Sequence, residues 1–433
     1  MIVVELAVLL FFIYLGSRLG SIGIGLAGGA GVLVLTLGLG MTPGHIPIDV
    51  ILIIMSVIAA IAAMQMAGGM DYLVYLAQRL LRKHPKYITV LGPLVTYSMT
   101  LMAGTGHTAF STLPVIAEVA KEQGIRPSRP LSISVVASQV AITASPISAA
   151  VVFFSGILEP LGVSYIELLM ISIPASLFAV LIAALVTNFL GLELSKDPIY
   201  QERLAAGLVS SASRESQQVK PGAKRSVAIF LMGILLVVAY ATAISDKVGL
   251  ISDPILSRDQ AIMCFMLSIA TLISLVCRFD VAQITNAATF KSGMSACVCV
   301  LGVAWLGDTF VSNHLSDIQA LSGDVLSDYP WMLAVVMFFA SMLLYSQAAT
   351  TKALMPAALA MGVDPVAAIA AFAAVSALFV LPTYPTLIAA VEMDDTGSTR
   401  IGRWVFNHPF VIPGLLTIVL AVAFGFAIGP LVV

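Results

Sequence analysis

Two clusters of small and hydroxyl-bearing residues interrupt apolar stretches of this sequence and could bind a small anion. The first reads GTGHTAFSTLP and contributes the candidate ligands Thr105, Gly106, His107 and Thr108. The second reads YSQAATTKALMP and contributes Gln347, Thr350, Thr351 and Lys352. Hydroxyl and amide groups donate hydrogen bonds to carboxylate oxygens. Helices that begin at such breaks also present free backbone N–H groups and a partial positive charge, so both clusters predict an anion site.

A second pair of clusters follows the first, each built around a proline inside an apolar run. ITASPISAA contributes Thr143, Ser145, Pro146 and Ser148, and LPTYPTLIAA contributes Thr383, Tyr384, Pro385 and Thr386. Backbone groups freed at such breaks are tolerated in hydrocarbon only where protein or a water-filled cavity satisfies them. Because hydroxyls surround these prolines, we interpret the breaks as part of the binding site. Packing is the alternative for all four clusters, since Ser and Thr also bond to their own helix.

The titratable residues near these clusters narrow the chemistry. Lys352 is the one basic residue that the predicted spans place within the membrane, where a charge is costly and usually functional. We expect it to act as a counter-charge for a carboxylate; the alternative is that its long side chain reaches the membrane surface. His107 could contact the ligand or be a satisfied polar residue. Acidic residues are missing from the middle of the spans, which favours exchange of like-charged substrates over proton symport, while sodium coupling through backbone carbonyls stays open.

The elements that position these residues must be membrane helices. The chain has 433 residues, of which 59% are hydrophobic and only 10% are charged, whereas soluble domains carry roughly 25% charged residues. A spanning helix needs roughly 20 largely apolar residues. Such runs predict spans at about 1–16, 22–40, 48–67, 88–104, 131–157, 166–190, 226–245, 260–277, 291–312, 331–347, 365–390 and 408–430. The hairpins predicted at 104–120 and 347–362 are too short to cross and are expected to be re-entrant.

The distribution of basic residues predicts the orientation. If both termini face the periplasm, nearly all Lys and Arg fall in cytoplasmic loops, as the positive-inside rule requires for an inner-membrane protein. The polar segment 191–225 is then a cytoplasmic linker between an N-terminal membrane repeat, 1–190, and a C-terminal membrane repeat, 226–433.

Matching clusters in the two halves predict their relationship. Pro114 and Pro356 are separated by nearly the same number of residues as Pro146 and Pro385. Because the first half starts at the periplasm and the second at the cytoplasm, the repeats are expected to be inverted. The predicted fold class is therefore an all-α polytopic membrane protein of two inverted repeats with re-entrant hairpins and broken helices, as in ion transporters.

Other functional classes lack their signatures. The spans contain no nucleophile–base pair, so we expect no enzyme and no cofactor. The four cysteines are interpreted as small buried hydrophobic residues, so we expect no metal site. No G-x-x-x-x-G-K-[ST] phosphate loop occurs, so we expect no ATP-driven transport. The stretch GIGIGLAGGAG favours close helix packing through small residues. A net charge of −2 offers no basic field for nucleic acid. The partners are then the lipid bilayer and a small anion, carried by a transporter or, as a rival, conducted by a channel.

Several longer stretches match one known family. They are PKYIT, GTGH, LPVIAEVAKEQG, ASPISAAVV, GVAWLGDTFVSN, YSQAA, LPTYPT, MDDTGSTRIG and FNHPF. Over nearly its whole length the chain thus resembles the anaerobic C4-dicarboxylate transporter (Dcu) family. This resemblance implies an inner-membrane antiporter that exchanges or takes up L-aspartate, fumarate, malate and succinate, with cation-coupled symport of dicarboxylates or another small organic anion as the alternative.

The resemblance also bears on substrate and partners. The segments AKEQG, YSQAATTKA and MDDTGSTR look more like the aspartate-uptake type of the family. His107 departs from that type, in which asparagine is more frequent, and is similar to the fumarate/succinate exchange type, so the preferred dicarboxylate stays open. Some members of the family signal to a membrane sensor kinase; that kinase and a homo-oligomer are the protein partners considered.

Overall fold

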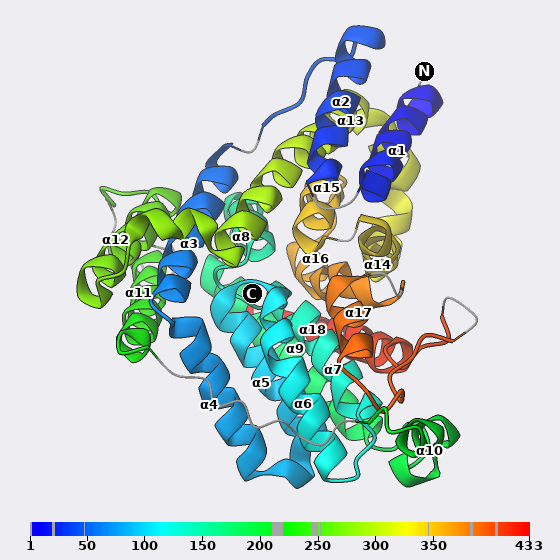
Figure 1. The fold of residues 1–433 in the computed structure, drawn as a ribbon. Helices are drawn as coiled ribbons and strands as arrows, with labels where there is room; N and C mark the ends of the chain where they lie inside the picture. Colours follow the sequence, from blue (N-terminus) through cyan, green and yellow to red (C-terminus); the bar gives the residue numbers. More distant parts are fainter. Residues whose placement is uncertain are drawn as a thin grey trace.

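The computed structural model describes residues 2–19, 22–46, 48–209, 220–244, 250–251, 253–344, 346–381, 384–402 and 406–433. All regular elements within these residues are helical (Figure 1). Thr383 lies outside the described residues, and so does the side chain of His107.

Within the described residues, four helices are long and apolar enough to cross a membrane, and each matches a predicted span. They are α9 (Tyr165–Thr187), α11 (Ala223–Ala243), α12 (Arg258–Cys277) and α18 (Val411–Val432). Capping boxes start two of them, Ser164 with Glu167 for α9 and Ser257 with Gln260 for α12. These pairs satisfy backbone N–H groups that the first helical turn leaves without a partner.

The remaining predicted spans are shorter or bent. The first three apolar segments form α1 (Ile2–Leu19), α2 (Gly23–Leu33) with the π-helical η1 (Val34–Gly38), and α3 (Ile48–Met66). Helix α4 (Gly69–Lys83) follows α3 at a bend of 68°. It is amphipathic, with Leu73, Ala77 and Leu81 buried, so a search for continuous apolar runs does not predict it.

A helix pair and a broken helix follow in the first half. Their elements are η2 (Pro85–Tyr87), α5 (Ile88–Ala103), η3 (Gly106–Thr108), α6 (Ala109–Glu122), α7 (Ser128–Val140), η4 (Ala141–Thr143), α8 (Ala149–Leu158) and η5 (Glu159–Leu161). Gly104 ends α5 with φ at 68°, a left-handed conformation that glycine adopts without steric cost. The span predicted at 131–157 is interrupted between η4 and α8, where the proline-centred cluster predicts a break.

The second half repeats this order of elements. It contains α14 (Met332–Leu344), α15 (Gln347–Ala360), α16 (Pro365–Phe372), η8 (Ala373–Phe379) and α17 (Pro385–Glu392). The two broken helices meet, because the Ser376 hydroxyl donates a hydrogen bond to the Gln139 carbonyl oxygen at 3.2 Å. The amide of Gln347 donates to the same oxygen at 3.2 Å, which ties the start of α15 to the first break.

Helices α1, α2 and α13 (Ala288–Asp328) form an arm that extends from the rest of the molecule (Figure 1). The short η7 (Val281–Asn286) precedes α13 and contacts α3. Glycines allow α2 and α13 to pack closely: a Cβ added to Gly302 would lie 1.8 Å from the Gly25 carbonyl oxygen, and one added to Gly28 would lie 2.4 Å from the Gly302 carbonyl carbon. The packing interpretation of the glycine-rich stretch is thus confirmed. Helix α13 extends beyond its predicted span and kinks at His314.

The start of the predicted linker is folded onto both halves. It contains η6 (Leu194–Lys196) and α10 (Pro198–Ala205). The buried Asp197 carboxylate forms ion pairs with Arg126 at 2.6 Å and Arg400 at 3.4 Å. Burial raises the pKa of Asp197, but the Ile199 N–H and the guanidinium groups of Arg126 and Arg400 outweigh that effect and leave the pKa lowered. The linker therefore joins segments that lie far apart in the sequence.

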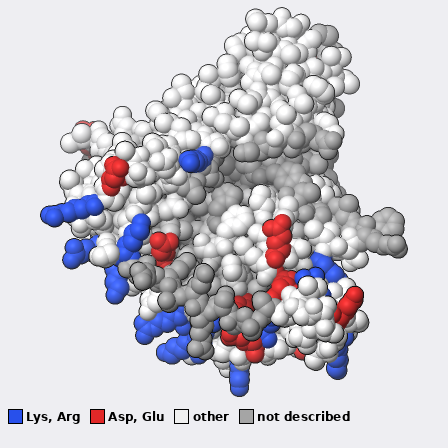
Figure 2. Space-filling view, in the orientation of Figure 1, with Lys and Arg blue, Asp and Glu red and all other residues white. Residues whose placement is uncertain are grey.

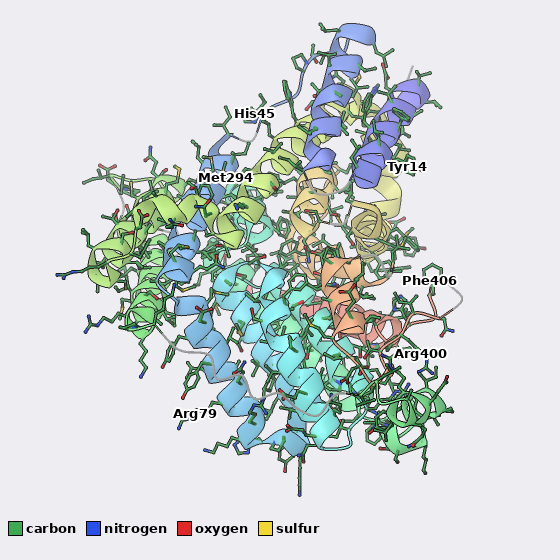
Figure 3. All side chains as sticks on the ribbon, in the orientation of Figure 1. Tyr14, His45, Arg79, Met294, Arg400 and Phe406 are labelled. Carbon is green, nitrogen blue, oxygen red and sulfur yellow. The ribbon has the colours of Figure 1, made fainter. Side chains whose placement is uncertain are left out.

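Charged residues gather at one end of the molecule. On the face shown in Figure 2, Lys and Arg lie around α4, α10, α11 and α12, whereas the described part of α1 and α2 shows none. Figure 3 places Arg79 of α4 and Arg400 at this same end.

Candidate functional site

One cavity of about 1120 Å³ lies among helices from both halves. Residues of α3 and α4 form one wall, and residues of α5, α6 and α8 form another. Gly293 of α13 and the start of α15 complete it; Met294, labelled in Figure 3, marks where α13 passes this wall. Ligand pockets typically occupy about 300–1,000 Å³, so the cavity has room for a small ligand together with water.

The inner end of the cavity is built by the tips of two helix pairs, α5 with α6 and α14 with α15. We use the word tip for the residues between the two helices of a pair and at the start of the second helix. The first tip contributes Gly104, Thr105, Gly106 and Thr108, and the second contributes Ser346, Gln347 and Ala348. A Cβ on Gly104 would lie 3.0 Å from Ile147, so this tip approaches the first break closely. None of the described cavity-lining residues at these tips is charged.

Hydrogen bonds fix the polar groups at the tips. The Thr108 hydroxyl shares a hydrogen bond with the Thr100 hydroxyl at 2.8 Å. The Ser346 hydroxyl accepts from the Ala349 N–H at 3.1 Å and caps α15. Ser346 lines the cavity although it is missing from the predicted site; its position directly before a helix that begins with Gln347 is the signal for an N-cap.

Of the predicted site residues whose side chains the structure describes, five line the cavity. They are Thr105, Gly106, Thr108, Gln347 and Tyr384. Phe110 and Ser111, which follow the first tip, also line it. The structure thus brings together residues of both predicted hairpins and of the second proline cluster.

The predicted residues of the first proline cluster do not line the cavity; Thr143, Ser145 and Ser148 are buried and Pro146 is half-buried. Thr143 donates to the Val140 carbonyl oxygen at 2.8 Å, and Ser145 donates to the Leu101 carbonyl oxygen at 2.7 Å. Ser148 caps α8 by accepting from the Val151 N–H at 3.2 Å. The Pro146 carbonyl accepts from the Tyr165 hydroxyl. In this structure these groups hold the broken helix in shape.

Several predicted residues of the second half are also buried outside the lining. Thr350 and Thr351 donate back to the Ser346 and Gln347 carbonyl oxygens at 2.8 and 2.7 Å, the pattern that competes with ligand binding. Pro385 starts α17. Thr386 is fully buried, and its hydroxyl has no hydrogen-bond partner among the described residues.

Lys352 is buried rather than placed at the membrane surface. Its side chain is 3% exposed, and Nζ lies 5.6 Å from the centre of the Phe153 ring. Nζ has no hydrogen-bond partner in the described part of the chain. Lys352 does not line the cavity in this structure.

The opposite end of the cavity carries ion pairs that the predicted site does not include. Arg82 of α4 pairs with Glu118 of α6 at 2.6 Å, and Lys121 of α6 pairs with Asp395 at 2.8 Å. All four residues line the cavity. We refer to these four residues as the mouth.

Comparison with known proteins assigns the family. Residues 1–433 match the family described as the anaerobic C4-dicarboxylate membrane transporter. The chain belongs to this family. Its members are transporters and not enzymes, so the apolar helices make this family member a multi-pass membrane transporter. The resemblance stated from the sequence motifs is thereby confirmed.

Relatives within the family align over essentially the whole chain. C4-dicarboxylate transporter DcuA of Wolinella succinogenes is 66% identical over 431 residues, covering 100% of both chains. DcuA of Escherichia coli is 58% identical and covers 99% of each. Anaerobic C4-dicarboxylate transporter DcuB of Escherichia coli is 36% identical and covers 98% of this chain and 97% of its own.

Solved structures share the fold of this C4-dicarboxylate transporter family member at low sequence identity. The YdaH transporter of Alcanivorax borkumensis aligns with a TM-score of 0.55 at 13% identity, over 87% of this chain and 85% of its own. MtrF of Neisseria gonorrhoeae, from a class of antimetabolite efflux pumps, aligns with a TM-score of 0.54 at 15% identity, over 92% and 84%. Both support the all-helical transporter architecture.

Proposed function

We propose that the protein is an inner-membrane antiporter that exchanges C4-dicarboxylates such as L-aspartate, fumarate, malate and succinate. The observation that carries this proposal is the cavity between the two tips, where uncharged donors from both halves converge. The names of the relatives support C4-dicarboxylates as the substrate class.

Binding would use neutral donors at the tips. The hydroxyls of Thr105 and Ser111 and the amide of Gln347 all line the cavity and are groups that donate to carboxylate oxygens. The backbone at the starts of α6 and α15 would add partial positive charge. A ligand held this way keeps its negative charge, so an exiting dicarboxylate can be replaced by an entering one without a proton.

Alternating access would move the two tips and the broken helices against α3 and α4. The shared element order of the halves supports inverted repeats at 1–190 and 226–433 joined by the linker 191–225, a plan in which the site lies near the middle of the membrane. Under the positive-inside rule we expect the mouth to face the cytoplasm and both termini to face the periplasm. A homo-oligomer and a membrane sensor kinase remain predicted partners on the family resemblance alone.

The test uses purified protein in liposomes. Vesicles preloaded with succinate should take up labelled aspartate or fumarate without a sodium or proton gradient, whereas vesicles that contain no dicarboxylate should take up little. Saturation of this counterflow distinguishes a carrier from a channel, and competition among the four acids ranks them. Uptake into empty vesicles that requires an ion gradient would contradict antiport and establish a cation-coupled symporter.

A further inference from the structure

Lys352 differs from the other buried cations of the described chain in having no counter-ion. Arg126 pairs with Asp197 at 2.6 Å, and Arg129 pairs with Glu193 at 3.0 Å. Lys352 is more deeply buried than either, yet no carboxylate among the described side chains lies within ion-pair distance of it. The Phe153 ring is the partner that the structure shows. A ring face attracts a cation, but it replaces only part of the hydration that burial removes.

Lys352 lies one helical turn behind the cavity wall. In α15, α8 and α13, a residue that lines the cavity is followed four positions later by Lys352 itself or by one of its neighbours. The pairs are Ala348 and Lys352 in α15, Ala149 and Phe153 in α8, and Gly293 and Cys297 in α13. Residues four apart share one face of a helix, so the surroundings of Lys352 adjoin the cavity wall.

The wall residues beside Lys352 and its neighbours are small. Ala348 and Ala149 carry only a methyl group and Gly293 carries no side chain, so little material separates Lys352 from the cavity at these positions. Side chains in an α-helix lean toward its N-terminus, which in α15 is the end that forms the tip. Four residues rise about 6 Å along a helix, a distance that the flexible four-carbon stem of lysine can cover.

We infer that Lys352 is the counter-charge that makes transport an exchange, an inference that rests on the proposed function and deepens it. With a dicarboxylate at the tips, Nζ leaves the Phe153 ring and pairs with one carboxylate of the substrate. With the cavity empty, Lys352 stays uncompensated. Because an uncompensated charge is costly in hydrocarbon, the empty protein changes its access slowly, and the loaded protein changes it fast.

The experiment compares two cation–π lysines in the liposome assay. Lys352→Met keeps the length of the side chain and removes its charge, and Lys224→Met is the matched control because Lys224 Nζ lies 5.7 Å from the Tyr72 ring centre on the exposed surface. Aspartate uptake is measured in succinate-loaded and in empty vesicles. We expect the loaded-to-empty ratio of the wild type to be about tenfold or more, the ratio of Lys352→Met to approach one, and its half-saturating concentration to rise about tenfold. Lys224→Met should behave like the wild type.

The outcomes separate this inference from the proposed function. A wild-type ratio near one refutes antiport itself. A wild type that exchanges, together with a Lys352→Met variant of unchanged ratio and unchanged half-saturation, overturns the role of Lys352 alone. If Lys352→Met shows no transport, its affinity for succinate is measured by thermal stabilisation in detergent. An affinity equal to that of the wild type overturns the inference. A loss of affinity in Lys352→Met that is not seen in Lys352→Arg supports it.

Discussion

The two ends of the cavity use polar groups in opposite ways. At the tips, hydroxyl, amide and backbone groups from both halves surround the space, and none of the described lining side chains is charged. At the mouth, cations and carboxylates line the space and already pair with each other, as Arg82 does with Glu118 and Lys121 with Asp395. The tips therefore have donors for an anion, while the mouth has most of its charge compensated.

This difference suggests a division of tasks. The hydroxyl and amide donors at the tips can bind the carboxylates of a substrate through hydrogen bonds, whereas the cations at the mouth are already held in ion pairs. Ion pairs at the charged end connect segments that are distant in sequence, and they reach their deepest burial at Asp197. We thus expect changes at the tips to alter affinity, and changes at the charged end to alter stability or rate.

The largest expected effect on stability comes from Asp197→Asn. The substitution leaves Arg126, a buried cation, without its carboxylate, and breaking a buried pair in this way costs about 3–5 kcal/mol. The thermal unfolding of the protein in detergent should shift to a markedly lower temperature. Glu193→Gln is the matched control, since the Glu193 side chain is 57% exposed and exposed pairs contribute about 1 kcal/mol or less.

The pH dependence of unfolding sharpens this prediction. The folded state lowers the pKa of Asp197, so its contribution to stability is present above the ordinary aspartate pKa near 3.9. That contribution is lost as the pH falls through the lower pKa of the folded state. The stability difference between wild type and Asp197→Asn should therefore be constant near neutral pH and shrink only in acid. A difference that disappears between pH 6 and pH 5 would contradict this account.

At the tips, Gln347→Ala should raise the half-saturating substrate concentration about tenfold with little loss of stability. Its amide carries two N–H groups, one of which bonds to the Gln139 carbonyl, and a hydrogen bond to a charged ligand contributes about 1.5–3 kcal/mol. Counterflow measured over a range of aspartate concentrations tests this. Gln123→Ala, at an exposed position after α6, should leave the curve unchanged; a similar curve for both variants would remove Gln347 from the site.

Hydropathy and proline placement predict much of the fold but not the rotation of its helices. The break before α8 and the glycine packing of α2 on α13 follow from local sequence. The sequence also marks Thr350 and Thr351 as polar residues beside a tip, but whether they face the cavity or their own helix depends on packing. In the structure both bond back to α15.

The mouth is the part of the cavity that local patterns miss. Helix α4 is too polar for a hydropathy search, although its buried Leu73, Ala77 and Leu81 recur at helical spacing and could predict it. Lys121 and Asp395 are 274 residues apart, so no local pattern could join them. The positive-inside rule assigns Arg82 and Lys121 to cytoplasmic loops, but it does not predict that they line a cavity.

The smallest expected effect comes from Lys121→Gln at the mouth. Lys121 is partly exposed and paired with Asp395, so its attraction for an approaching dianion is mostly compensated and is screened by salt. Uptake at low ionic strength should fall about threefold, and the salt dependence of uptake should weaken. Asp395→Asn, which frees the same cation, should raise the rate at low ionic strength instead. If Lys121→Gln raised the half-saturating concentration at high salt as strongly as Gln347→Ala, the mouth would be part of the binding site and the two ends of the cavity would not divide their tasks.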